Sequence, residues 1–229
     1  MDPRRWLFAR GRRRLGARFL AGDGIEIGAL HSPFPVPSRA RVRYLDRLTT
    51  QQLRAEYPEL AGEPFAEVEI VDDGSTLQSI PDGSLDFVVA AHVLEHVEDP
   101  IGALRRQLDV LRSGGTLVLA LPDRRRGLDE LRAPVTVEHL LADHADGGAG
   151  SRSGHYREWA RLVDLPLGLV EAEDVEAHAA GLEWGGHDIH FHCWTLEELL
   201  AQLPAFGLPA TVAAARQNLH EFLVVLRRD

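Results

Sequence analysis

The sequence predicts an α/β fold in which a mostly parallel sheet has helices on both faces. Two short apolar runs rich in β-branched residues, 85–91 and 116–121, are typical of strands that are buried on both faces. Apolar residues recur at helical spacing over 101–111, and a strand–helix–strand unit of this kind forms a right-handed parallel crossover. The 229 residues, 45% of them hydrophobic, suffice for a single domain spanning 1–229.

Residues 1–20 predict a basic amino-terminal helix. They include seven arginines, and the residues expected to pack inward are Trp6, Leu7, Leu15 and Phe19. The arginines then form a solvated face, and contact with phosphate or an anionic lipid is the alternative. We expect no secretory signal, because the segment lacks a long apolar core and a cleavage site.

Acidic residues accompany the ends of the next predicted strands. The elements expected in order are strand 24–30, strand 41–46, helix 49–60 and strand 68–71. Glu26 lies in the first strand, Asp46 ends the second and Asp73 follows the third. Asp46 lies 20 residues past Glu26, close to the spacing at which a dinucleotide fold places an acid on a ribose. Gly28 allows the backbone to approach a ligand closely.

Polar residues also follow the two central strands. His92–His96 comes after 85–91 and Pro122–Asp123 after 116–121, while Gly114–Gly115 is expected to end the intervening helix. Ligands of open parallel sheets bind beyond the carboxyl ends of the strands. We therefore expect a functional site at this edge.

Residues 124–186 contain no predicted strand. Short helices are expected over 136–144, 155–163 and 169–180, and Thr136 can cap the first of them. A segment of this length beside the strand ends predicts an inserted helical lid.

Residues 187–194 alternate, which predicts a strand with its histidines on one face. Thr195 and Glu198 form a capping box for the helix that follows. The remaining elements are helix 196–203 and strands 211–215 and 221–226. The last strand is expected to be antiparallel, as in mixed sheets.

Composition argues against several classes of partner. The net charge of −10 disfavours nucleic acid, because phosphate binding draws on clustered positive charge. No apolar run approaches the roughly 20 residues that a bilayer span needs. The single cysteine, Cys193, cannot form an internal disulfide and is expected to pack in the core, which suits a cytoplasmic location.

The order of these elements, with Glu26–Ile27–Gly28, Asp46, Asp73 and Val93–Val97, resembles the class I S-adenosylmethionine-dependent methyltransferases, which have a Rossmann-like sheet. The resemblance covers about residues 22–123 well and the closing strands more loosely. It departs from the family after the first strand, where a single glycine replaces the usual two or three.

The resemblance implies that S-adenosylmethionine binds at the strand ends. The Gly28 loop is expected to face the methionine part, Asp46 the ribose, Asp73 with Gly74 the adenine, and His92 the sulfonium. The implied cofactor-binding residues are therefore Glu26, Gly28, Asp46, Asp73, Gly74 and His92.

Four further segments resemble bacterial methyltransferases of polysaccharide and glycan gene clusters, including actinobacterial enzymes that methylate mannose oligosaccharides. These segments are Pro122–Arg125, Glu138–Leu140, Gly154–Tyr156 and His190–Trp194. The likeness implies a small-molecule saccharide substrate, O-methylation and a role in polysaccharide biosynthesis. A homodimer is left open.

Nine of the eleven histidines lie between His92 and His192, at predicted strand ends or in the predicted lid. Because an alcohol reacts poorly while protonated, a histidine that acts as general base near neutral pH would help its methylation. We expect His144 to be that base, with His139 and His155 as the alternatives. Each of these histidines can instead cap or pack.

A divalent metal such as magnesium is a further hypothesis. Glu95 and His96 fall where metal-dependent quinone-biosynthesis and small-RNA methyltransferases carry ligands. Magnesium prefers oxygen ligands, however, and His92 stands at one acid position. The favoured interpretation is that this turn packs and caps.

The expected substrate contacts are Tyr156, His190, His192 and Trp194, with the indole as a platform for a sugar. A zinc site made by His187, His190 and His192 is the less favoured alternative. Three functions follow: a saccharide O-methyltransferase, a metal-dependent O-methyltransferase of a small phenolic metabolite, and a non-catalytic module that binds S-adenosylmethionine.

Overall fold

The computed structural model describes residues 3–229, with side chains from residue 8 onward. Helix α1 (Pro3–Phe19) occupies the predicted basic segment, and Leu15 is buried while Phe19 is partly buried. The expected packing of Trp6 and Leu7 lies outside the described side chains. Within the described chain, no helix combines the length and the apolar character that crossing a membrane requires.

Seven strands in residues 3–229 form one sheet with the order β3-β2-β1-β4-β5-β7-β6. Their bounds are β1 Gly22–Ile27, β2 Ala40–Asp46, β3 Val68–Val71, β4 Leu85–Ala91, β5 Leu111–Pro122, β6 Ala210–Asn218 and β7 Glu221–Arg228. Strands β1 to β5 are parallel, and β7 is antiparallel to both of its neighbours. The predicted α/β fold, a Rossmann-like mostly parallel sheet with an antiparallel last strand, is confirmed.

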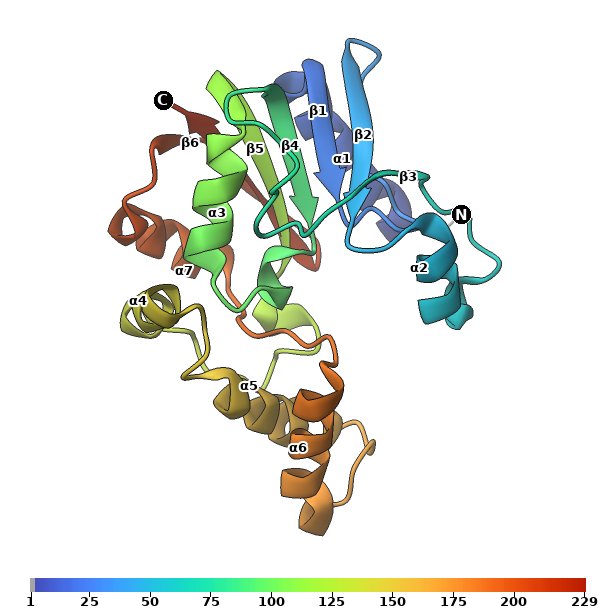
Figure 1. Cartoon of the computed structure of the whole chain (residues 1–229), viewed down its shortest axis with the longest axis vertical. Helices are drawn as coiled ribbons and strands as arrows, with labels where there is room; N and C mark the ends of the chain where they lie inside the picture. The colour runs from blue at the N-terminus through green and yellow to red at the C-terminus, as the bar shows by residue number, and fades with distance from the viewer. Residues whose placement is uncertain (1–2) are drawn as a thin grey trace.

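Helices cover both faces of this sheet, as predicted. The other α-helices are α2 Thr50–Glu56, α3 Pro100–Asp109, α4 Val137–Asp146, α5 Arg152–Trp159, α6 Val175–Gly185 and α7 Leu196–Gln202. One face packs against α3 and α7 through Ile101, Leu104 and Leu199. The opposite face packs against Leu15 of α1 and Phe34 of the proline-rich loop after β1. In Figure 1, α3 lies in front of the sheet and α1 behind it.

Residues 124–186 carry helices and no strand, as expected. Thr136 caps α4 by accepting from the backbone N–H of His139, and a π turn, Ala160–Asp164, continues α5. The carboxyl ends of β1, β2 and β4 point toward the side on which α4, α5 and α6 extend (Figure 1). The third predicted helix is displaced toward the carboxyl terminus, because α6 begins at Val175.

Two local predictions were wrong. Helix α3 ends at Asp109, and Gly114–Gly115 lies inside β5, because the fully buried Leu111 already pairs with Leu85 of β4. The predicted strand over 187–194 is absent apart from one bridge between Asp123 and Trp194. The N–H groups of Phe191 and His192 instead donate to the carbonyl of Glu95, while β7 occupies the edge of β5.

Candidate functional site

Strained backbone marks the carboxyl edge of the sheet. Gly28, directly after β1, has φ 66°, while Leu30 and His92 have φ 44° and 57°. Side-chain-bearing residues rarely adopt this left-handed region, and such strain gathers at functional sites. The edge also brings Gly74 against Ile27, since a Cβ on that glycine would lie 2.4 Å from Ile27 Cγ2.

Glu26 is a buried acid that lacks one partner. Its Oε1 accepts from the N–H of Phe34 at 2.8 Å, whereas Oε2 is buried and has no hydrogen-bond partner among the described residues. Burial raises the pKa of Glu26 to about 7, against the opposing effects of the Phe34 hydrogen bond and the Arg12 charge. A buried carboxylate oxygen of this kind is available to a cationic donor.

The two other predicted acids differ in exposure. Asp46 ends β2, and burial raises its pKa although the N–H of Arg47 lowers it. Asp73 is exposed and accepts from the N–H of Ser75 at 2.7 Å, so it stabilises its own turn. The strand ends are adjacent, because the N–H of Asp72 donates to the Asp46 carbonyl.

Two residues that sequence reasoning missed reach this edge from distant segments. His92 Nε2 lies 3.0 Å from Oε2 of Glu221, the first residue of β7, and Arg12 of α1 donates to both oxygens of that carboxylate. Burial would raise the pKa of Glu221, but hydrogen bonds from His92 and Arg12 lower it. The sequence offers one signal for Glu221, which is an acid directly before the apolar run 222–226.

Glu95 is a second buried carboxylate with unpaired oxygens in the described part of the chain. It is 1% exposed, and neither oxygen makes a hydrogen bond in the described chain, although Oε1 lies 3.5 Å from His92 Nδ1. Ligand atoms of Glu95, His96 and His190 lie within 4.8 Å of one another.

The two histidines of this group are themselves oriented by acids. His96 Nδ1 lies 2.8 Å from Asp188, and His190 Nδ1 lies 2.7 Å from the buried Asp129, which the sequence analysis did not single out. Burial would lower the pKa of His96, but the hydrogen bond to Asp188 and the charge of Glu95 raise it.

Four other side chains meet where residues 124–186, which we call the helical segment, contact residues 187–194. We call these four the histidine cluster: His139 and Asp143 of α4, His155 of α5 and His192. Burial would raise the pKa of Asp143, but hydrogen bonds from His192 and Ser151 lower it to about 2. Burial and the neighbouring imidazoles lower the pKa of His155 to about 4. Asp143 is therefore a carboxylate, and His155 is neutral, at neutral pH.

The expected base His144 lies outside this cluster. Its Nδ1 is 3.0 Å from the carboxylate of Asp99, which also accepts from the N–H of Gly102 at the start of α3. His139 and His155 instead face each other, with their Nε2 atoms 3.2 Å apart.

Three of the four expected substrate contacts are buried. Trp194 is 1% exposed and donates to Gln202, so the expected sugar platform has no open face in this structure. The Tyr156 hydroxyl donates to the His187 carbonyl, and His192 bonds Asp143. The predicted strand face of histidines is not formed, because 187–194 is not a strand, and His190 and His192 contact different acids, Asp129 and Asp143. Cys193 is buried, as predicted, and burial raises the pKa of its thiol to about 12.

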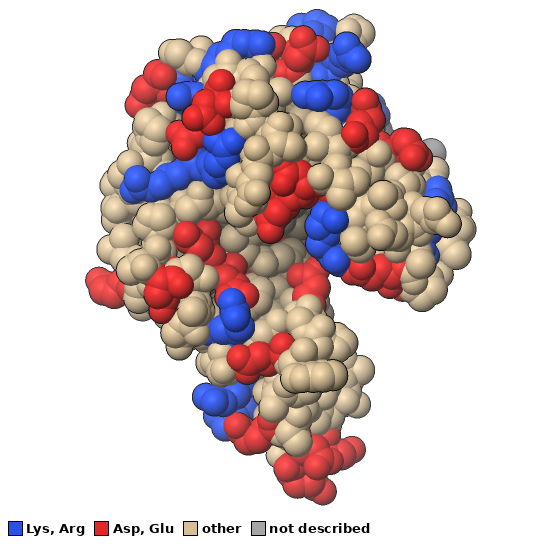
Figure 2. Space-filling model, viewed as in Figure 1, with Lys and Arg blue, Asp and Glu red and all other residues tan. Residues whose placement is uncertain are grey.

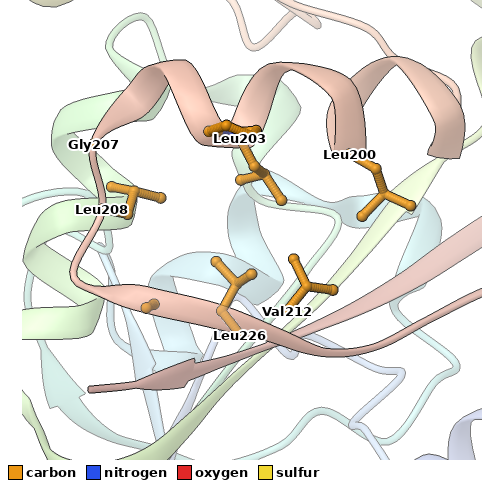
Figure 3. A pocket seen from close by; sticks show the side chains of 8 residues that line it. Leu200, Leu203, Gly207, Leu208, Val212 and Leu226 are labelled. Atoms are coloured by element: carbon orange, nitrogen blue, oxygen red, sulfur yellow. The ribbon is translucent and has the colours of Figure 1, made fainter.

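Two hollows are apparent on the surface. Figure 2 shows the surface hollowed between the part that carries α2 and the helical segment below it. A separate apolar groove of about 180 Å³ lies between the turn after α7 and strands β6 and β7, lined by Leu203, Leu208 and Leu226 among others (Figure 3). The candidate residues at the carboxyl ends of the strands, Glu26, Gly28, Asp46, Asp73, Gly74 and His92, form what we call the strand-end site, and none of them lines that groove.

Known proteins resemble this chain over part of its length. The family model described as "Methyltransferase domain" matches residues 28–119. An uncharacterized 37.1 kDa protein in transposon TN4556 of Streptomyces fradiae is 36% identical over 106 residues, which cover 44% of this chain and 28% of that protein. The ubiquinone biosynthesis O-methyltransferase of Xanthomonas campestris pv. campestris is 32% identical over 91 residues, 40% of this chain and 36% of that protein.

The likeness of fold extends over the whole chain. A SAM-dependent methyltransferase from Aquifex aeolicus superposes with a TM-score of 0.53 and 11% identity, covering 100% of this chain and 94% of its own. At this identity the likeness concerns the fold alone.

Proposed function

We propose that this chain transfers a methyl group from S-adenosylmethionine to a saccharide hydroxyl, a proposal supported by the likeness of its fold to a SAM-dependent methyltransferase and by the match of residues 28–119 to the family model described as "Methyltransferase domain". The substrate is a mannose oligosaccharide of polysaccharide biosynthesis in this proposal. The choice of a saccharide as the substrate rests on the sequence resemblance described above. The choice of S-adenosylmethionine as the methyl donor rests on the strand-end site.

The observation that carries the proposal is the buried Oε2 of Glu26, which has no hydrogen-bond partner among the described residues. The amino group of S-adenosylmethionine is a cation that can donate to this oxygen, beside the Gly28 backbone with its positive φ. Asp46 and Asp73 supply carboxylates at the next two strand ends, with Gly74 and His92 beside them. When bound, S-adenosylmethionine supplies an activated methyl group, and these residues bind and orient it.

His144 is the proposed general base. The Asp99 carboxylate at Nδ1 fixes the imidazole and leaves Nε2 to accept a proton from the acceptor hydroxyl. His139 and His155 are less suited, because their Nε2 atoms already face each other and Asp143. Of the expected substrate contacts, we keep His190, which is partly exposed and is oriented by Asp129.

Residues 124–186 act as a lid in this proposal. They extend from the carboxyl edge of the sheet and carry His144, so that their position decides whether the base reaches an acceptor (Figure 1). Loops and inserted segments at this edge are where open α/β sheets place specificity.

Calorimetry with S-adenosylhomocysteine tests the cofactor site. We expect Asp46→Ala to weaken binding by about tenfold or more, the scale of a lost hydrogen bond to a buried charged group. Asp23→Ala is the matched control, because Asp23 lies at the amino end of β1 and is exposed. Equal affinity in the wild type and both variants contradicts the proposed site.

Transfer of labelled methyl groups to mannose oligosaccharides tests the reaction. His144→Ala is expected to reduce turnover by about 10²–10⁴-fold and to leave cofactor affinity unchanged, as for loss of a general base. Unchanged turnover removes His144 from this role. Tight cofactor binding without transfer to any acceptor supports a non-catalytic module instead.

A metal-dependent O-methyltransferase of a phenolic metabolite is the second candidate. The observation that favours it is the buried Glu95 carboxylate, which has no hydrogen-bond partner in the described chain and lies near His96 and His190. A hard divalent ion such as magnesium would use the carboxylate oxygens. Full activity after chelation of divalent ions rejects this candidate. Activity that is lost on chelation and restored by magnesium in the wild type, but not restored in Glu95→Gln, supports it.

A further inference from the structure

The histidine cluster draws its four ligand atoms from three separate segments. His192 Nε2 lies 2.8 Å and His139 Nε2 lies 3.2 Å from Asp143 Oδ2. His155 Nε2 lies 3.6 Å from the same oxygen and 3.2 Å from His139 Nε2. Zinc–nitrogen bonds of about 2.0–2.1 Å in a tetrahedron give ligand–ligand separations of about 3.3 Å. These four separations bracket that value, and all four ligand atoms lie within 4.8 Å of one another.

The contacts around Asp143 Oδ2 also favour a cation at the centre. His192 Nδ1 lies 3.2 Å from the Val97 carbonyl, which can only accept, so in the neutral tautomer that donates to Val97 the Nε2 atom has a lone pair. In that tautomer the lone pair faces Asp143 Oδ2 at 2.8 Å, whereas a His192 that is protonated on Nε2 donates to this oxygen. A proton on His192 would relieve this contact alone. One metal ion relieves all the contacts among the four atoms.

The surroundings have the outer hydrogen bonds that orient metal ligands. Besides the His192–Val97 contact, the Ser151 hydroxyl donates to Asp143 Oδ1 at 2.6 Å, which leaves Oδ2 for the centre of the cluster. Histidine ligands generally donate their second ring N–H to a carbonyl or carboxylate, and ligating carboxylates are themselves hydrogen-bonded. Asp143, His155 and His192 are buried, and His139 is partly exposed.

We propose that His139, Asp143, His155 and His192 bind one zinc ion in a closed tetrahedral site. Protein atoms fill all four positions, as in structural zinc sites, so the ion joins α4, α5 and residues 187–194. Through Val97 it also ties this helical segment to the loop after β4. The site is separate from the Glu95 group, and it does not depend on the proposed methyl transfer.

Metal analysis of the full-length chain tests the site. After expression with zinc and dialysis against metal-free buffer, we expect about one zinc per chain. His139→Ala removes the most exposed ligand and is expected to lose the bound zinc on dialysis. His144→Ala is the matched control, because His144 lies on the same helix with 33% of its side chain exposed, against 38% for His139. Glu95→Gln is expected to retain zinc, which separates this site from the Glu95 group.

Ser151→Ala provides a readout that keeps all four ligands. Loss of the hydrogen bond to Asp143 is expected to weaken zinc binding by about 10–100-fold in competition with a chromophoric chelator. Cobalt substitution should give the intense visible absorption of a tetrahedral ion. A folded wild-type chain that contains no zinc and takes up none at micromolar concentration overturns the proposal. Unchanged zinc affinity in both Ser151→Ala and His139→Ala does the same.

Discussion

The carboxyl edge of the sheet and the helical segment differ in how completely they pair their buried acids. In the helical segment, each of three buried aspartates bonds a histidine: Asp129 with His190, Asp143 with His192 and Asp164 with His178. At the sheet edge, Glu26 and Glu95 are equally buried, yet both have oxygens with no hydrogen-bond partner among the described residues.

The difference follows from what holds each region together. The sheet has extensive apolar clusters on both faces, whereas the helical segment has two small ones, around Tyr156 and around Ala160. Polar contacts must therefore contribute a larger share of the stability of the helical segment. The sheet edge can tolerate buried acceptors without partners, and such acceptors are where a ligand with donors gains most.

Breaking the Glu221 network of the sheet edge should have the largest effect. The Glu221 side chain is buried and bonds Arg12, Asn218 and His92. Arg12→Ala leaves this charge without its main partner and is expected to lower the free energy of unfolding by about 3–5 kcal/mol. Urea unfolding measures this change.

Arg112→Ala is the control for that measurement. Its ion pair with Asp86 is exposed, so its loss should cost less than about 1 kcal/mol. Equal effects of the two substitutions would mean that the Glu221 network contributes no more than a surface pair.

The pKa of Glu26 gives the next largest effect. Only the carboxylate form pairs with the amino group of the cofactor, and the pKa of Glu26 is about 7 in the free protein. Binding therefore releases a proton, and affinity rises with pH up to about 7 and levels off above it. Between pH 6 and pH 8 we expect about a tenfold gain in affinity for S-adenosylhomocysteine by calorimetry.

Glu26→Gln is the test of that assignment. The glutamine keeps an acceptor for the N–H of Phe34 but cannot ionise, so the affinity should be lower and independent of pH between 6 and 8. A wild-type affinity that does not change over this range contradicts the pairing of Glu26 with the amino group.

The sequence predicted the sheet better than the helical segment for a physical reason. Strand patterns, caps such as Thr136 and Thr195, and acids at strand ends are local features, and the structure contains them. Glu221, the partner of His92, lies 129 positions away in the sequence, and Asp143 lies 49 positions from its partner His192. Periodicity does not reveal such distant pairs. Alternation over 187–194 predicts a strand, but alternation indicates only that successive side chains point in opposite directions. It does not indicate that the segment pairs with a sheet.

The site was predicted in the same uneven way. Gly28, Asp46 and Glu26 lie at one edge because parallel strands bring their carboxyl ends together. The histidine cluster required knowledge of how α4, α5 and residues 187–194 pack. His139 and His155 were singled out for their residue type, and nothing in their spacing indicated that they face the same carboxylate.

Two threonine caps, one beside the sheet and one in the helical segment, allow the stabilities of the two regions to be compared, with the smallest expected effects. Thr195 caps α7, which packs on the sheet, and Thr136 caps α4 in the helical segment. Each Thr→Ala substitution is expected to cost about 1 kcal/mol, and Thr195→Ser should restore most of the loss at α7. We expect Thr195→Ala to shift the global urea midpoint. Thr136→Ala should instead speed amide exchange in α4 by about fivefold and move the global midpoint less, because segments with small apolar cores open locally. Equal shifts of the urea midpoint in the two variants would show that the helical segment and the sheet unfold as one unit. The polar contacts of the helical segment would then stabilise that segment as well as an apolar core would.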